Sequence, residues 1–413
     1  MNETLSPKTA EDVLHAVRWA QTQEAPLEIV GHGTKRGWGR PGQSNHVLDM
    51  SALSGIELYE SDELVLSALP GTPMAEIETT LADAGQALAF EPPDFGPLFG
   101  QPVGQQSFGG TIACNLAGPR RVKAGAARDH LLGFHAVTGR GEAIKSGGRV
   151  VKNVTGYDLS KLVTGSFGTL GVLTEATIKV LPRGEKTRTV LLYGQGDAGA
   201  IKALAVALNG PHEISAAAHL PPTLAGRSSV SYVIESGTSV SAVRVEGPGP
   251  SVEHRCGALR QVWAGIGDTE ELHGHNSQTF WSEVRDVAPL LDEAPLTDAS
   301  PAIWRISVAP TAGAAIAEAA VDQLQAEVYF DWGGGLVWVA AENGRREAAT
   351  ILRAAVAANG GGHTTLIRGS EALRRAVPVF EPQPEPVARV TRGLKEQFDP
   401  NGILNPGRMY EGV

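Results

Sequence analysis

Apolar residues recur every three or four positions in two early segments of the chain, which is the spacing of one helix face. The first set is Val13, Leu14, Val17 and Ala20, and the second is Met74, Ile77 and Leu81. These spacings predict two helices. The first is expected to begin at Ser6-Pro7, because Ser is a favoured N-cap and Pro a favoured first helical residue. The second is expected over 73–84.

Shorter apolar runs bounded by glycine, proline or polar residues predict strands. In the first half of the chain these runs lie at 27–30, 47–49, 64–69, 130–138 and 169–181. The segment 91–108 holds too many prolines and glycines for regular structure. It retains several apolar side chains, so we expect an ordered loop, and long ordered loops are usually functional.

The pattern changes near Pro182-Arg183-Gly184, where glycine clusters give way to alanine-rich helical segments. From Ile303 to Ile367 the order reads strand, helix, strand, strand, helix, strand, which is the split βαβ unit. Residues 189–267 look like a looser, partial version of the same order. The predicted fold class is α+β, with a second domain at 183–385.

Length and charge narrow the class of protein. A chain of 413 residues is long enough for two domains, and its net charge of −10 without a basic block argues against nucleic-acid binding. No apolar run reaches the roughly 18–20 residues of a membrane helix. The N-terminus lacks the features of a signal peptide. Cys114 and Cys256 are too few for a disulfide framework or for an iron–sulfur cluster, so we expect a cytoplasmic protein.

Glycine is unusually frequent, with 50 residues, and concentrates between Gly96 and Gly171, which suggests backbone close to backbone or to a ligand. Gly31-His32-Gly33-Thr34-Lys35 is typical either of an anion-binding nest or of an ordinary strand-exit turn. The neighbouring stretch 37–42 matches G-x-G-x-x-G, but Pro41 and a strand follow it instead of a helix. A nicotinamide-type Rossmann site is therefore rejected.

Two further glycine clusters lie at 107–115 and 165–173. In the first, a glycine pair opens a short predicted helix, which favours a pyrophosphate site; Cys114 there is more typical of a buried filler than of a nucleophile. The chain has no Walker A motif, so the sequence does not indicate binding or hydrolysis of a nucleoside triphosphate. The pairs His130/His135 and His273/His275 lack a third ligand, and we predict no metal site.

These residues carry a resemblance to a known family. Residues 108–117, Gly-Tyr-Asp-Leu at 156–159, Gly-Ser-Phe-Gly-Thr-Leu-Gly-Val-Leu at 165–173 and the tail 398–408 resemble the FAD-linked oxidases of the vanillyl-alcohol oxidase type. Within that family, residues 329–334 and 401–408 are similar to the smaller FAD-binding subunits of bacterial glycolate oxidases. The resemblance implies a PCMH-type, two-part FAD-binding domain at 1–182, a cap at 183–385 and a C-terminal segment at 386–413 that returns to the FAD domain.

The resemblance also implies a set of residues around a non-covalent FAD. The Gly31–Lys35 loop would hold the pyrophosphate, the 165–173 loop would reach the adenosine end, and Asn405 and Arg408 would lie near the flavin ring or the cap. Some relatives attach the flavin through a histidine in the first loop, which makes His32, and less so Cys114, an alternative covalent site. The implied cofactor-binding residues are Gly31, His32, Gly33, Thr34, Lys35, Pro70, Gly71, Thr72, Gly109, Gly110, Thr111, Ala113, Cys114, Asn115, Gly118, Gly165, Gly168, Gly171, Val172, Leu173, Asn405 and Arg408.

The chain departs from the family in its cap. Catalytic 2-hydroxy-acid dehydrogenases of this family carry a His-x-Gly-Asp-Gly-Asn-x-His run, which is missing here; 273–276 is only faintly similar. The remaining candidates for substrate contact are Arg305, His363 and Arg368, since arginine suits a carboxylate and histidine can act as a base. Their alternative interpretation is that all three are ordinary surface or salt-bridge residues.

The resemblance implies an FAD-binding subunit that oxidises glycolate to glyoxylate by hydride transfer to flavin. Its partners would be a larger FAD-containing catalytic subunit and an iron–sulfur subunit, through which it could lie peripherally at the inner membrane. Three alternatives stay open: a flavin-bearing electron-relay or assembly subunit without substrate chemistry, a stand-alone oxidase of 2-hydroxy acids or sugars, and a non-flavin α/β binding protein. The choice between glycolate and D-lactate also stays open.

Overall fold

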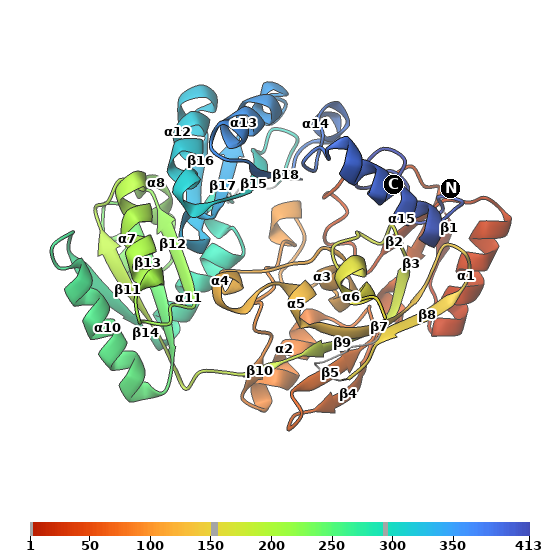
Figure 1. The fold of residues 1–413 in the computed structure, drawn as a ribbon, viewed down its shortest axis with the longest axis horizontal. Helices are drawn as coiled ribbons and strands as arrows, with labels where there is room; N and C mark the ends of the chain where they lie inside the picture. The colour runs from red at the N-terminus through yellow and green to blue at the C-terminus, as the bar shows by residue number, and fades with distance from the viewer. Residues whose placement is uncertain (1–2, 150–155, 292–295) are drawn as a thin grey trace. The chain divides into compact units, whose positions relative to one another are not determined.

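A computed structural model describes residues 3–149, 156–291 and 296–413, and the chain divides into two compact units (Figure 1). Unit 1 comprises Met1–Ala117, Gly125–Pro182 and Pro378–Val413, and unit 2 comprises Gly118–Ala124 and Arg183–Val377. The chain passes from unit 1 to unit 2 after Pro182. The chain returns to unit 1 at Pro378, and the short stretch Gly118–Ala124 groups with unit 2.

The strands of unit 1 form three sheets, with the strand orders β1-β3-β2, β4-β5-β9-β7-β8 and β10-β6. The first sheet is parallel and the second is antiparallel. In chain order the elements are β1 (Glu3–Leu5), α1 (Ala10–Thr22), β2 (Leu27–Val30), β3 (His46–Asp49), η1 (Met50–Ala52), β4 (Ile56–Glu60), β5 (Val65–Ala68), α2 (Met74–Asp83), β6 (Gln86–Ala87), η2 (Pro97–Phe99), α3 (Phe108–Ala113), α5 (Ala127–His130), β7 (Leu131–Val137), β8 (Ala143–Gly147), α6 (Leu159–Val163), β9 (Val172–Lys179), β10 (Leu181–Pro182) and α15 (Glu385–Phe398).

Helix α1 forms as predicted but begins later. Its N-cap is Thr9, whose hydroxyl accepts a hydrogen bond from the Asp12 N–H at 3.1 Å while the Asp12 carboxylate accepts from the Thr9 N–H at 3.0 Å. This reciprocal capping box satisfies two otherwise unpaired backbone donors. The predicted start at Ser6-Pro7 is therefore wrong, because Thr9 and Asp12 supply the cap and the helix begins at Ala10.

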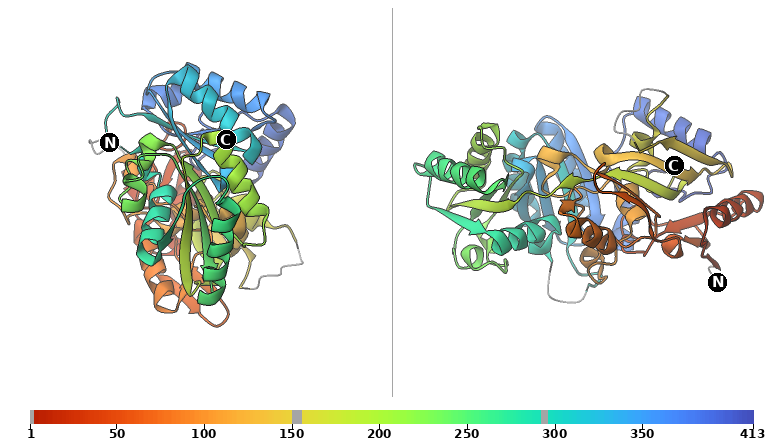
Figure 2. Two further views of the ribbon diagram at one scale, coloured as in Figure 1. Left: turned by 90° about the vertical axis from the view of Figure 1, so that its left-hand side faces the viewer. Right: turned by 90° about the horizontal axis from the view of Figure 1, so that it is seen from below.

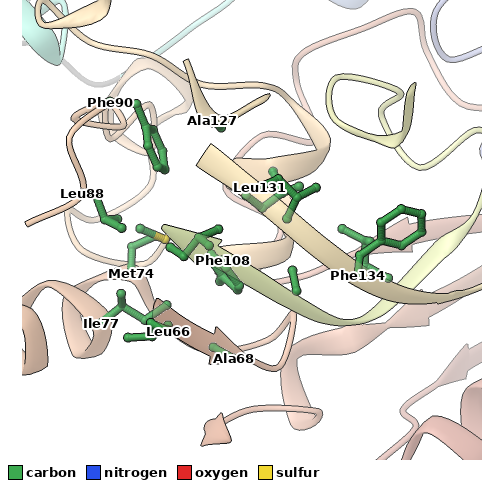
Figure 3. Close-up of a cluster of buried hydrophobic side chains, with 14 of the residues drawn as sticks. Leu66, Ala68, Met74, Ile77, Leu88, Phe90, Phe108, Ala127, Leu131 and Phe134 are labelled. Carbon is green, nitrogen blue, oxygen red and sulfur yellow. The ribbon is translucent and has the colours of Figure 1, made fainter. Parts of the chain in front are cut away.

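The five-stranded sheet of unit 1 buries its apolar residues against α2 and α3. Leu66, Met74, Ile77 and Phe108 are at most 1% exposed and point toward one another in Figure 3. The predicted helix face Met74, Ile77 and Leu81 is confirmed. Because β5 and β9 are buried here, their ends are held rigidly, and the loops that leave these ends lie at fixed positions.

The C-terminal tail extends the parallel sheet of unit 1. Leu27 of β2 donates its N–H to the Ile403 carbonyl at 2.7 Å, and its own carbonyl accepts from the Asn405 N–H at 3.0 Å. A parallel bridge joins Leu27 to Leu404. The tail thus lies directly beside the strand that leads into the first glycine loop.

Unit 2 is built on a single antiparallel eight-stranded sheet with the order β14-β11-β13-β12-β16-β17-β15-β18. Its elements are α4 (Arg121–Ala124), β11 (Lys186–Tyr193), α7 (Asp197–Asn209), β12 (Ala216–Leu220), α8 (Pro222–Ala225), α9 (Ser231–Ile234), β13 (Val240–Gly247), α10 (Gly249–Trp263), β14 (Thr269–His273), α11 (Gly274–Arg285), η3 (Ala288–Leu290), β15 (Ala302–Val308), η4 (Pro310–Ala312), α12 (Gly313–Leu324), β16 (Glu327–Asp331), η5 (Trp332–Gly334), β17 (Leu336–Ala341), α13 (Glu347–Ala358), β18 (Gly362–Arg368) and α14 (Glu371–Ala376).

The sheet of unit 2 consists of two split βαβ units. The second runs β15-α12-β16-β17-α13-β18, which confirms the predicted order. The first runs β11-α7-β12-β13-α10-β14 and is complete; its regularity was hidden in the sequence by the inserted helices α8 and α9. The two halves meet where His219 of β12 pairs with Phe330 of β16. Figure 2 shows the long helices of this unit lying along its sheet.

Candidate functional site: a glycine-lined pocket in unit 1

The first wall of the site is the loop that follows β2. Gly33 has a φ of +72°, and the N–H groups of residues 32–35 donate to no acceptor within the described part of the chain. A Cβ on Gly31 would lie 2.1 Å from the Ser107 Oγ, so only glycine fits there. Successive unpaired N–H groups form a concave surface that suits an anion.

Lys35 adds a positive charge to this loop. Its Nζ lies 3.3 Å from the Thr34 Oγ1, and Lys35 makes no ion pair within the described ranges. Burial lowers the pKa of Lys35, against the opposing effect of Cys114 and Asp94. The next residue, Arg36, is paired with Glu28. Because an unpaired, desolvated ammonium is costly, Lys35 is suited to bind an incoming anion such as a diphosphate.

The second wall comes from Ser107 and helix α3. The N–H of Gly109 donates to the Pro70 carbonyl at 2.8 Å, and that of Gly110 points to the Ser107 Oγ at 3.4 Å. These donors are therefore engaged within the chain, and the expectation that they form the anion site does not follow from their geometry. Gly109 instead permits close packing, because a Cβ there would meet the Pro70 Cβ at 2.6 Å. The glycine pair shapes the wall, and the first loop supplies the free donors.

The third wall is the 165–173 loop, held by the tail. Phe167 and Gly168 have φ values of +54° and +72°. The Asn405 side chain donates to the Phe167 carbonyl at 2.7 Å and accepts from the Ile29 N–H at 2.8 Å. One amide thus joins β2 to this loop. Arg408 secures the first loop in a similar way, since its Nη2 donates to the carbonyls of Lys35 and Arg36 at 3.2 and 3.0 Å.

The three walls enclose two adjoining cavities, with volumes of about 530 and 450 Å³ including their open mouths. One end holds charged groups and the other is mainly apolar, which matches a ligand with a diphosphate and flat ring systems. Both cavities are lined by Ile29, Val30, Gly31, Ser107, Gly110, Ala113, Phe167 and Asn405; the first adds Glu28, Gly33, Thr34, Lys35, Arg36, Cys114 and Arg408, and the second adds Met50, Pro70, Gly109, Gly168, Gly171, Val172 and Leu173.

Several pocket residues were not among the predicted ones. Ile29 and Val30 precede the first glycine loop, Ser107 precedes the glycine pair, and Phe167 lies inside the third glycine cluster. A signal existed for Ser107, because a serine directly before a helix start is a favoured N-cap, and it caps α3. The sequence held no signal that Phe167 lines the pocket. Its position depends on a left-handed backbone, which is uncommon for a residue other than glycine.

Other predicted residues support the walls without lining the pocket. The Thr72 Oγ1 donates to the carbonyls of Gly55 and Leu69, and a Cβ on Gly71 would meet the Met50 carbonyl at 2.4 Å. The Thr111 Oγ1 donates to the Ser107 carbonyl, and the Asn115 Oδ1 accepts from the Arg128 N–H. Gly165 donates its N–H to the Ile112 carbonyl. Gly118 belongs to unit 2, where its carbonyl accepts from the Trp332 Nε1.

The two candidates for covalent attachment differ in position. Cys114 lines the charged end of the pocket, whereas the His32 Nδ1 lies 2.8 Å from the Gln105 carbonyl and the ring is outside the lining. Burial raises the pKa of the Cys114 thiol, although Lys35 and Arg408 act in the opposite direction. A thiol held in its protonated form is a poor nucleophile, which favours non-covalent binding.

The three substrate candidates of unit 2 lie on neighbouring strands. Arg305 of β15 pairs with Thr365 of β18, and His363 pairs with Ser307 and is exposed. The Arg368 guanidinium donates twice to the Pro301 carbonyl, at 3.1 and 2.8 Å, and the residue is 7% exposed. Its donors are engaged in holding the chain before β15. Arg305 differs from both, because it is partly buried and makes no hydrogen bond to the described residues.

The mixed α/β fold and the glycine-lined pocket are those expected of a protein that binds a dinucleotide such as FAD. Residues 3–147 match the family model described as "FAD binding domain". The chain is 34% identical over 405 residues to the glycolate oxidase subunit GlcE of Escherichia coli (strain K12), covering 97% of each protein. The chain therefore belongs to the family of FAD-linked oxidoreductases that includes the glycolate oxidase subunit GlcE, and its cofactor is FAD.

Two further likenesses are a relative matched over part of the chain and a solved structure matched over nearly all of it. The glycolate oxidase subunit GlcD of Bacillus subtilis (strain 168) is 30% identical over 198 residues, which is 48% of this chain and 40% of that protein. The solved 4-ethylphenol oxidase from Gulosibacter chungangensis has a TM-score of 0.71 at 15% identity, over 99% of this chain and 89% of that one. At this identity it shows the fold alone. No described helix has the length and hydropathy to cross a membrane.

Lys35→Met is expected to weaken FAD binding about 10- to 100-fold, because a hydrogen bond to a charged group contributes roughly 1.5–3 kcal/mol. The matched control is Lys145→Met, which removes an equally charged but exposed side chain from β8 of the same unit. Titration of the apoprotein with FAD, followed by flavin fluorescence, measures both. Equal affinities for the two variants would remove Lys35 from the diphosphate site.

Proposed function

We propose that this chain is the FAD-bearing subunit of a complex that oxidises glycolate to glyoxylate. The observation that carries the proposal is the likeness to the glycolate oxidase subunit GlcE, which extends over both units and not over the FAD domain alone. The glycine-lined pocket supports it, because its charged and apolar ends match the two parts of a dinucleotide. When bound, FAD supplies the chemistry by accepting a hydride from the carbon that bears the hydroxyl group.

The residues of unit 1 are assigned to holding and orienting the cofactor. The N–H groups of residues 32–35 and the Lys35 ammonium bind the diphosphate. Asn405 and Arg408 keep the surrounding loops in place through their hydrogen bonds to Phe167, Lys35 and Arg36. Pre-formed donors of this kind lose little freedom when the ligand binds, so they contribute more affinity than flexible ones.

The residues of unit 2 are assigned to the substrate. Arg305 binds the carboxylate of the 2-hydroxy acid, and His363 is the candidate to accept its hydroxyl proton. Arg368 is assigned to positioning the strands, because its guanidinium is hydrogen-bonded to the Pro301 carbonyl. Cys114 and Cys256 cannot ligate an iron–sulfur cluster, so electrons leave through partners. We propose a larger FAD-containing catalytic subunit and an iron–sulfur subunit in that role.

The test is an anaerobic visible spectrum of the purified full chain before and after glycolate is added. Bleaching of the flavin band by glycolate, but not by acetate, which lacks the hydroxyl group, is the expected result. D-Lactate, added separately, reports the substrate range. A flavin band unchanged by glycolate would contradict substrate oxidation by this chain alone.

A second candidate function is electron relay or assembly without substrate chemistry. The specific observation in its favour is that the chain lacks the His-x-Gly-Asp-Gly-Asn-x-His run of the catalytic relatives. In that case the isolated chain keeps its flavin unbleached, and glycolate bleaches it only after the partner subunits are added. An active, monodisperse monomer would instead favour a stand-alone oxidase.

A further inference from the structure

Two arginines of unit 2 converge on the ring of one tryptophan. The Arg121 Cζ lies 4.5 Å and the Arg305 Cζ 5.0 Å from the centroid of the Trp332 ring. Neither guanidinium has a hydrogen bond or an ion pair within the described part of the chain, although each carries five donors. A guanidinium that is drawn out of water without an acceptor is unfavourable unless a ligand supplies one.

The other arginine–tryptophan stacks of the described chain differ in this respect. Arg244, 5.1 Å from the Trp281 ring, donates to the Ser215 Oγ at 3.1 Å and pairs with Glu246. Arg353, 6.0 Å from the Trp304 ring, donates to the Ala349 carbonyl. Stacking on tryptophan therefore does not by itself leave an arginine without an acceptor, and the pair at Trp332 is exceptional.

The turn that presents Trp332 is rigidly built. Trp332, Gly333 and Gly334 have φ values of +53°, +65° and +99° in succession. The Trp332 N–H donates to the Asp331 Oδ1 at 2.7 Å, and its Nε1 donates to the Gly118 carbonyl at 3.1 Å. A left-handed backbone at a tryptophan is uncommon and is retained where the surroundings enforce it. The Trp332 ring is thus a fixed surface against which both guanidinium groups lie.

The charges around the Trp332 ring leave an excess of one positive charge. Burial lowers the pKa of Arg305 to about 10; Arg121 lowers it further and Asp331 opposes the effect. The partly buried Arg305 therefore has one further guanidinium group and one carboxylate among its charged neighbours, and Arg121 itself is exposed. A ligand with one negative charge would balance these charges and accept the unused donors.

We propose that Arg121 and Arg305, held over Trp332, form a binding site for a small monocarboxylate anion of the 2-hydroxy-acid class. The two guanidinium groups bind the carboxylate oxygens, with Arg305 as the desolvated anchor and Arg121 as the exposed second donor. Trp332 and Arg121 thereby become specificity-determining residues next to Arg305. This proposal rests on the proposed function for the choice of acid, but it is tested by binding and does not require turnover.

The experiment is a titration of the full-length, FAD-loaded protein with glycolate and with glycolamide, its uncharged amide, by isothermal calorimetry under anaerobic conditions. Glycolate is expected to bind and glycolamide is not, because only the carboxylate complements the arginines. Arg305→Met should weaken glycolate binding about 10- to 100-fold. Arg121→Met should weaken it by a smaller factor. Arg353→Met, which removes the arginine from the Trp304 stack, is the matched control and should bind as wild type.

Two further measurements keep the result interpretable. Arg305→Lys preserves the charge without the planar fork, so it should fall between wild type and Arg305→Met; it also serves if Arg305→Met fails to fold. Trp332→Phe should remove the glycolate-dependent change in tryptophan fluorescence. Equal binding of glycolate and glycolamide, or unchanged affinity in both Arg305 variants, would overturn the proposal. Glycolate that binds at this site but leaves the flavin unbleached would instead contradict only the proposed oxidation.

Discussion

Gly110→Glu is expected to produce a folded protein that does not retain FAD. Gly110 lines both cavities of the pocket, and a Cβ at this position would lie 3.5 and 3.6 Å from the Cε and Nζ of Lys35. A glutamate carboxylate built from that Cβ can reach the Lys35 ammonium. It would take the place of the diphosphate and would repel its negative charge.

The loss of affinity should be at least about 100-fold, since a like charge placed against a bound anion costs several kcal/mol. Flavin content per protein chain after gel filtration, read from the visible spectrum, measures it. Gly42→Glu is the matched control, because it adds the same charge in the same unit where a Cβ would meet nothing within 4 Å. Gly110→Ala separates shape from charge, because its methyl group has only the Ser107 Oγ, at 3.1 Å, in close approach. One FAD per chain in purified Gly110→Glu would show that the FAD diphosphate does not bind next to Gly110.

The features of the fold that could be predicted are those set by neighbours in the sequence. The helix face of Val13 and Val17 and the complete strand–helix order of the second half of unit 2 were recognisable because each is a local period of apolar residues. Strand β8 was not predicted. Its sequence Ala-Ile-Lys-Ser-Gly has no alternating pattern, and it becomes a strand because β7 offers it a row of backbone partners.

The glycine loops of the pocket were also recognisable from the sequence, but the function of their donors was not. Gly31–Lys35 and Gly109-Gly110 look equally suited to an anion. They differ only because the Pro70 carbonyl and the Ser107 hydroxyl engage the donors of the glycine pair, and both partners arrive through tertiary folding. The role of Asn405 has the same origin, since it contacts Ile29 from 376 residues away.

For the substrate candidates of unit 2, the sequence could indicate which residues are polar but not which contacts they make, and Arg305 is an example. Sequence reasoning could place it with His363 and Arg368 as polar residues of one predicted sheet. It could not show that Arg368 is engaged by the Pro301 carbonyl, or that Arg121, from a segment that precedes the second domain in sequence, groups with the same unit. Stacking on Trp332 depends on a left-handed turn that tryptophan rarely adopts.

The second large effect is expected at the buried ion pair Lys395–Asp399, called the clasp below, which fixes the C-terminal tail of unit 1. The Lys395 Nζ donates to the Asp399 Oδ2 at 2.7 Å and to the carbonyls of Thr169 and Leu404, each at 2.8 Å. Asp399 in turn accepts from the N–H groups of Ile403 and Leu404 at 3.1 and 2.8 Å. Lys395 is 4% and Asp399 1% exposed. This one ion pair therefore joins α15, the 165–173 loop and the residues that lead to Asn405.

Lys395→Met should lower the free energy of unfolding of unit 1 by about 3–5 kcal/mol, because it leaves the Asp399 carboxylate buried without its cation. Burial lowers the pKa of Lys395 despite the opposing effect of Asp399, so desolvation outweighs the attraction within the pair. For the same reason Lys395→Met combined with Asp399→Asn should be less destabilised than Lys395→Met alone, since no buried charge then remains. Urea denaturation followed by circular dichroism and by flavin release measures both.

The matched control is the exposed pair Arg375–Glu371, which has the same four-residue spacing and a separation of 2.6 Å but side chains that are 61% exposed. Arg375→Met should change stability by less than about 0.5 kcal/mol, because exposed ion pairs are screened by water. If Lys395→Met proves as mild as Arg375→Met, the buried pair is not what holds the tail. If Lys395→Met unfolds unit 1 at a lower urea concentration than wild type and releases flavin in the same transition, the tail is part of the structure that forms the FAD pocket. Asn405 then loses its position together with the clasp.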